Sequence, residues 1–86
     1  MIVDLNIPIS TQLIYDHKKN KVFPHKIQWK GNTYTITSIG LHYSYKKGKT
    51  LFHVFTASTE ALSFKLLLNT DNLFWTLEQI SDGEPD

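Results

Sequence analysis

The sequence predicts an all-β fold, a curved antiparallel meander of five to seven strands, with a partly open small barrel as its alternative form. Three observations support this. Apolar residues recur at every second position, the period of a strand with one buried face. Short polar or glycine-containing turns separate these runs. When the runs are paired across the turns, large apolar residues lie opposite one another, as a one-sided core requires.

The N-terminal segment predicts an edge strand. Its apolar residues alternate with polar ones at the positions Val3, Leu5, Ile7 and Ile9. Pro8 has no backbone N–H to donate to a ladder, so this strand is expected at the edge of a sheet. Residues 12–15 indicate a further short strand whose pairing the sequence leaves open.

The first hairpin is centred on the dipeptide Gly31-Asn32, which tolerates the positive φ of a primed two-residue turn. This turn predicts that Trp29 pairs with Tyr34 and Ile27 with Ile36. Beyond the hairpin the apolar residues change from even-numbered positions, which end at Ile36, to odd-numbered positions in the run 39–45. One extra residue at Thr37-Ser38 would restore the buried face, so we expect a β-bulge there.

Three further turns extend the same buried face. A turn at Lys47-Gly48 predicts that Tyr43 pairs with Phe52. A three-residue loop at 58–60 predicts that Val54 pairs with Phe64. A four-residue loop at 69–72 predicts that Leu66 pairs with Trp75. Together the four turns place the predicted core on one side of a five-strand meander, with the N-terminal segment added to it.

The opposite face of this register carries an apolar patch. Leu51, Leu67 and Phe74 fall in one outward row, with Phe55 beside it. Contiguous exposed apolar surface marks an interface in soluble proteins. Either the N-terminal segment folds across this patch, or a protein partner or a second copy covers it. We therefore expect a non-enzymatic interaction or self-association module, a homodimer being one form, with Leu51, Phe55, Leu67 and Phe74 as its interface.

The charge distribution suggests nucleic-acid binding as the alternative function. Eight lysines and no acidic residue lie between His17 and Lys49, whereas the chain as a whole has a net charge of +1 and no arginine. Lysine attracts phosphate as a point charge but lacks the planar fork that reads bases. The alternative is therefore a weak, salt-dependent binder that uses lysines in the turns: Lys18, Lys19, Lys21, Lys46, Lys47 and Lys49.

Neither catalysis nor a metal site is expected. No nucleophile elbow, phosphate-binding loop or metalloprotease motif is present. His42 and His53 pair in the predicted register, but zinc normally takes three or four protein ligands, and the chain has no cysteine. We expect no cofactor and no metal, and interpret the two histidines as polar residues of a half-covered sheet.

Size and composition fit one domain. The chain has 86 residues, of which 41% are hydrophobic and 13% aromatic, a globular composition. We expect a single β-domain at 1–81 and a flexible acidic tail at 82–86. The start has no basic region followed by an apolar run, and no stretch reaches the roughly 18 apolar residues of a membrane helix. We therefore expect a cytoplasmic protein with no membrane partner.

The stretch from Pro24 to Ile36 resembles a pattern of small uncharacterised bacterial all-β domains. In that pattern a proline precedes a hydrophobic-x-Trp-x-Gly hairpin and an x-x-Tyr-x-hydrophobic strand, and the likeness spans roughly residues 23–80. Members of that family sometimes lie beside DNA-repair proteins, so the resemblance adds support to nucleic-acid binding as the alternative function. The arginines usual in that family are lysine or absent here. The shared motifs are turn and core residues, so the resemblance implies a fold and transfers no functional residue.

Overall fold

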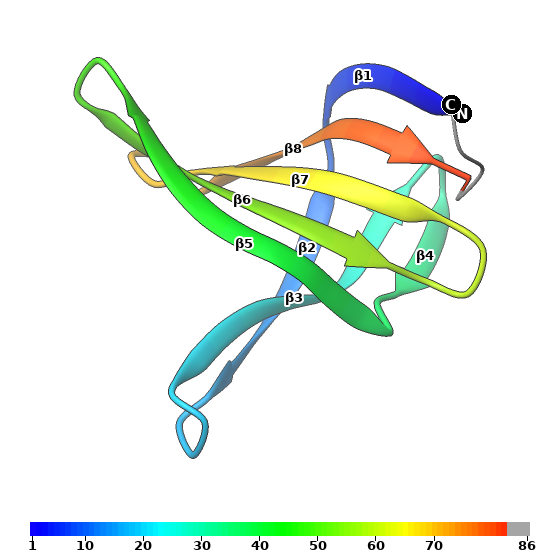
Figure 1. Cartoon of the computed structure of the whole chain (residues 1–86), viewed down its shortest axis with the longest axis horizontal. Helices are drawn as coiled ribbons and strands as arrows, with labels where there is room; N and C mark the ends of the chain where they lie inside the picture. Colours follow the sequence, from blue (N-terminus) through cyan, green and yellow to red (C-terminus); the bar gives the residue numbers. More distant parts are fainter. Residues whose placement is uncertain (83–86) are drawn as a thin grey trace.

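The computed structural model describes residues 1–82 and confirms the all-β antiparallel fold (Figure 1). It contains eight strands: β1 (Ile2–Pro8), β2 (Ser10–Asp16), β3 (Lys21–Trp29), β4 (Asn32–Thr35), β5 (Ser38–Lys47), β6 (Thr50–Ser58), β7 (Ser63–Asn69) and β8 (Phe74–Ser81). A five-stranded sheet has the order β1-β8-β7-β6-β5, and a three-stranded sheet has the order β2-β3-β4.

The chain passes between the two sheets at two places. The N–H of Ile9 still bonds to the carbonyl of Trp75 in β8, and the next residue, Ser10, pairs with Gln28 in β3. Similarly, the N–H of Ile36 bonds to β3 whereas that of Thr37 bonds to β6. The sheets are therefore joined at two corners, and they are not closed into a barrel.

The core lies between the inner faces of the two sheets. Its buried members come from both sheets and from the corner between them: Ile27, Ile36, Phe55, Ala57, Phe64, Leu66 and Leu77. Aromatic residues of the first hairpin contact this core, since the rings of Trp29 and Tyr34 lie 6.2 Å apart and Tyr34 meets Phe64 edge to face at 5.4 Å. Burial of these large side chains supplies most of the stabilisation available to so small a domain.

The N-terminal strand is an edge strand, as Pro8 predicts. β1 pairs only with β8, and Leu5 and Ile7 pack against the core. The residue before β1 is tied to the residue after β8, because the N-terminal ammonium of Met1 lies 2.8 Å from a carboxylate oxygen of Asp82. The predicted acidic tail thus begins with a residue that is paired with the N-terminus. The rest of that tail, 83–86, lies outside the described residues.

The hairpin formed by β3 and β4, predicted to turn at Gly31-Asn32, turns one residue earlier. Its central residues are Lys30 and Gly31, both with positive φ (53° and 76°), which is the backbone of a type I′ turn. Trp29 consequently pairs with Asn32, and Ile27 with Tyr34. The register is wrong by two residues, and because a shift of two preserves side-chain direction, the predicted inner face is retained.

The bulge that changes the face lies after the sheet corner and not at Thr37-Ser38. Ile39 pairs with Ala57 and His42 pairs with Phe55, which leaves Gly40-Leu41 opposite Thr56. The Thr56 hydroxyl accepts a bond from the Leu41 N–H at 2.6 Å. From here onward the even residues of β5 face inward, so the prediction that Leu41, Tyr43 and Tyr45 are core residues is wrong.

The predicted buried face of β6 is also wrong, because the loop that follows this strand is longer than predicted. The loop between β6 and β7 has four residues, 59–62, and not three, since Ser58 pairs with Ser63. Its closure is stabilised by a hydrogen bond from the Thr59 N–H to the Leu62 carbonyl at 2.8 Å. An odd change in register reverses a strand, so Phe55 joins the core cluster between the sheets, while Val54, which is 1% exposed, is buried on the opposite face of β6.

The last hairpin keeps its predicted inner face. The loop spans 70–73, one residue later than expected, and Leu66 pairs with Leu77 while Trp75 pairs with Leu68. Leu73 has a positive φ of 63°, and its N–H bonds to the Asn69 carbonyl. Strands β7 and β8 therefore present the predicted apolar residues to the core, although each pair is displaced by two.

Candidate functional site

Two strand edges diverge on one side of the molecule. β5 is the last strand of its sheet, so along Gly40–Lys47 one side of its backbone has no strand neighbour among the described residues. The first half of β3 is also unpaired on one side, because β4 pairs only with Lys26–Trp29. Figure 1 shows the β2–β3 hairpin and the β5–β6 hairpin pointing away from each other with an opening between them.

A cleft of about 540 Å³ lies at the base of this divergence, where the start of β5 is near β3. One wall is the β2–β3 hairpin and the other is the sheet corner with β5 and β6. The lining residues are Lys19, Lys21, Val22, Phe23 and Pro24 on the first wall, and Ile36–Gly40, His42 and Phe55 on the second. The cleft therefore combines an apolar floor, a basic rim and the edge of a sheet.

His42 lies on the second wall and forms a hydrogen-bonded pair with His53, which does not line the cleft. Nε2 of His42 is 2.8 Å from Nδ1 of His53, so one imidazole donates and the other accepts. The His42 ring also stacks on Phe55, with centroids 4.0 Å apart. The two histidines were predicted to pair directly on the outer face. In the structure they are diagonal neighbours on the inner face, because His42 pairs with Phe55.

The cleft disfavours a charged His42. Burial, and then the neighbouring His53, lower the pKa of the His42 imidazole below its usual value. Burial removes water from the charged form, and a second imidazole repels it once that imidazole carries a proton. The lowered pKa favours the neutral form of His42, in which its ring acts as a hydrogen-bonding group of the wall.

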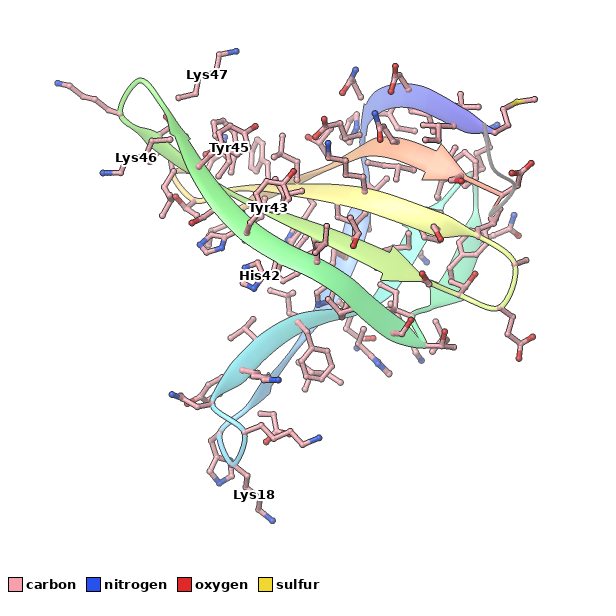
Figure 2. All side chains as sticks on the ribbon, viewed as in Figure 1. Lys18, His42, Tyr43, Tyr45, Lys46 and Lys47 are labelled. Carbon is pink, nitrogen blue, oxygen red and sulfur yellow. The ribbon has the colours of Figure 1, made fainter. Side chains whose placement is uncertain are left out.

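The six lysines named for nucleic-acid binding are divided between the two hairpins. Figure 2 shows Lys18 at the tip of the β2–β3 hairpin and Lys46 and Lys47 at the tip of the β5–β6 hairpin. Lys19 and Lys21 line the cleft, and Lys49 lies in the β5–β6 turn. Asp16, the nearest acid in sequence, accepts hydrogen bonds from the backbone N–H groups of Lys18 and Lys19. None of the six lysines forms an ion pair with another described residue.

The four residues predicted as one interface do not share a face. Phe55 is 4% exposed and belongs to the core, and Leu51 projects from the same face of β6. Leu67 and Phe74 project from the opposite face of the sheet, where Phe74 is 69% exposed. The prediction of a single outward patch is wrong, because the loop at 59–62 reverses β6 relative to β7.

The outer face of the five-stranded sheet carries a different set of aromatic residues. Tyr43 and Tyr45 are exposed there, on the side of β5 opposite His42 (Figure 2). Tyr45 stacks on Phe52 with centroids 5.4 Å apart. This face lies outside the cleft, and Tyr43 and Tyr45 are 45% and 41% exposed on it.

Sequence reasoning missed the cleft because it treated the meander as one continuous sheet. Two signals pointed to it. A glycine inside a strand pattern, here Gly40, suggests a bulge or a close backbone approach. The acid-free stretch from His17 to Lys49 contains both hairpin tips, and two of its lysines, Lys19 and Lys21, form the basic rim of the cleft.

Residues 1–82 contain no cluster of three or more histidine, cysteine, aspartate or glutamate side chains that could hold a metal ion. Within the same residues no helix is long and apolar enough to cross a bilayer. No protein-family model, curated protein or solved structure matches the chain. The resemblance to small bacterial domains therefore stays a prediction based on the hairpin pattern.

Proposed function

We propose that this protein is a non-enzymatic protein-interaction module that binds an extended polypeptide segment in the cleft beside β5. The observation that supports the proposal is the free edge of β5 along Gly40–Lys47, whose first part, at Gly40 and His42, lines a cleft of about 540 Å³. An edge strand presents a row of unpaired N–H and C=O groups that template another strand. Strand addition uses these groups for affinity and the adjoining pockets for specificity.

The position of the edge explains why it would serve a partner and not simply aggregate. Natural proteins protect edges with lysine, proline or bulges. The β1 edge carries Pro8, and the β5 edge has the Gly40-Leu41 bulge at one end and Lys46-Lys47 at the other. Between these ends the strand is free of both devices. A short segment of β5 is thus accessible to a strand that fits against the β2–β3 hairpin.

A display library of random twelve-residue peptides tests this proposal. We expect enriched clones that bind the native protein and lose binding in a Val22→Trp variant, which narrows the cleft. Val22 is 47% exposed, so the larger ring is tolerated by the fold. Val3→Trp is the matched control, because Val3 is 42% exposed on β1 and does not line the cleft.

Two results decide the outcome. Clones that bind both the native protein and Val3→Trp but not Val22→Trp would support the cleft. An absence of clones, or binding that Val22→Trp leaves unchanged, would reject it. Light scattering of the native protein adds the case of self-association: a dimer that Val22→Trp dissociates would identify a second copy as the occupant of the cleft.

Nucleic-acid binding is the second candidate, and it is favoured by Lys19 and Lys21 on the cleft rim together with the lysines at the two hairpin tips. Lysines spread over a surface can follow a phosphate backbone without reading sequence. Fluorescence anisotropy with a labelled single-stranded oligonucleotide at low and moderate salt tests this function. Binding that weakens steeply with salt would support it. No binding at low salt would reject it, because phosphate neutralisation is strongest there.

A further inference from the structure

The cleft has a one-sided charge. Lys19 and Lys21 lie on its rim, and no aspartate or glutamate is among the described residues that line it. Lys18 extends the positive charge to one hairpin tip, and Lys46 and Lys47 extend it to the other (Figure 2). Acidic side chains on a strand in the cleft would therefore be attracted by Lys19 and Lys21 on its rim, and more weakly by the lysines at the two hairpin tips.

The rings in the cleft are poorly placed for stacking with bases. Single-stranded nucleic acids bind mainly by stacking on exposed aromatic faces, in addition to phosphate contacts. Phe55 is buried beneath the His42 ring, and Phe23 is half-buried. The exposed tyrosines Tyr43 and Tyr45 lie on the other side of β5 (Figure 2). The cleft thus offers positive charge and backbone hydrogen-bonding groups, which suit an acidic peptide better than a nucleic acid.

We propose that the occupant of the cleft is an acidic extended peptide, in which carboxylates alternate with apolar side chains. This inference rests on the proposed strand addition beside β5. Alternation places one set of side chains toward the apolar floor formed by Ile39 and Phe55, and the other set toward Lys19 and Lys21. The lysines are not paired with carboxylates of residues 1–82, so within this part of the chain no carboxylate competes with those of a partner.

Three synthetic twelve-residue peptides test the inference. They share valine at every second position and carry glutamate, serine or lysine at the others, and a twelve-nucleotide oligothymidine is the fourth probe. We expect the glutamate peptide to bind tightest, the serine peptide more weakly and the lysine peptide least. Higher salt should weaken the glutamate peptide alone among the three, since screening acts on the charge pairs.

Charge variants locate the effect. Lys19→Gln/Lys21→Gln should weaken the glutamate peptide by about two- to thirtyfold, the range for two exposed ion pairs, and leave the serine peptide unchanged. Lys26→Gln/Lys30→Gln removes the same charge from residues that do not line this cleft, and should change neither peptide. Equal effects of the two double variants would mean that only net charge matters, which would overturn the inference.

The remaining outcomes distinguish a failure of the acidic-peptide inference from a failure of the proposed strand addition. Equal binding of the glutamate and serine peptides would overturn the acidic occupant and leave strand addition standing. Failure of all three peptides would overturn both. Oligothymidine binding that is tighter than the glutamate peptide, and lost in Lys19→Gln/Lys21→Gln, would overturn the peptide in favour of a nucleic acid.

Discussion

The imidazole of His42 stacks on the ring of Phe55, with the ring planes inclined by only 14°. This contact exists because the Gly40-Leu41 bulge turns the even residues of β5 inward, and because the loop at 59–62 turns Phe55 inward on β6. Two irregularities in the ladder thus build one wall of the cleft. The first predictions test these two irregularities.

Phe55→Ala and Phe74→Ala test which face of β6 and β8 is buried. Phe55 is 4% exposed and Phe74 is 69% exposed. We expect Phe55→Ala to lower the free energy of unfolding by about 3–5 kcal/mol, the usual cost of removing a buried phenylalanine. Phe74→Ala should cost less than about 1 kcal/mol, because that ring is already in water. Urea denaturation measures both, and similar losses for the two variants would contradict the observed register.

Gly40→Ala tests the bulge. A Cβ at position 40 would lie 2.7 Å from the Thr56 hydroxyl, which accepts the Leu41 N–H. We expect a loss of about 1–3 kcal/mol in the free energy of unfolding, typical of overpacking.

Thr56→Ala removes the clashing hydroxyl and provides the control for that prediction. In the Thr56→Ala background, Gly40→Ala should cost less than half of its value in the native protein. A double-mutant cycle from thermal or urea denaturation gives this coupling. Strictly additive effects would mean that the two residues are not in contact.

Gly31→Ala tests the type I′ turn. The φ of Gly31 is 76°, and no atom lies within 4 Å of a Cβ placed there, so the cost comes from the backbone alone. We expect Ala to lower the free energy of unfolding by about 1 kcal/mol, because residues with a Cβ disfavour positive φ. Asn tolerates this conformation, so Gly31→Asn should lose less. Equal losses for the two variants would indicate a steric cause.

His42 makes the stability of the fold depend on pH. The pKa of His42 is lowered by burial and by His53, so the unfolded chain takes up a proton at this residue more readily than the folded chain does. Its contribution to stability is therefore complete above the unfolded pKa of about 6.5 and is lost as the pH falls toward the folded pKa.

Urea denaturation at pH 7.5 and pH 5.5 measures that pH dependence. We expect the native protein to lose more stability between the two pH values than His42→Gln, which has no proton to gain at this position. An equal loss in the two proteins would show that other groups cause the effect.

The fold class followed from the sequence because side-chain period and turn chemistry are local. Runs such as Phe64 to Leu68 alternate clearly, and polar or glycine-containing turns separate the strands. In the first and last hairpins the inner faces were also predicted correctly, although the pairing was displaced by two. The reason is visible at Lys30-Gly31, where a lysine with positive φ occupies a turn position that the sequence assigns to glycine and asparagine.

The candidate site could not be predicted, because it depends on the exact length of one loop and the exact position of one bulge. One residue more or fewer in the 59–62 loop, or a bulge at Gly40-Leu41 and not at Thr37-Ser38, exchanges the inner and outer residues of a whole strand. Local propensity does not distinguish these alternatives. Packing of Phe55 against His42 and Trp75 does, and it requires three strands to be in place.

Amide hydrogen exchange with the glutamate peptide bound tests strand addition at β5 most directly. We predict that backbone amides between Leu41 and Lys47 gain protection at alternate residues. The exchange rates of the Lys21–Phe23 amides should change, whereas those of the β1 edge should stay the same. New protection along β1, or binding that leaves the amides of Leu41–Lys47 as exposed as in the free protein, would contradict the account.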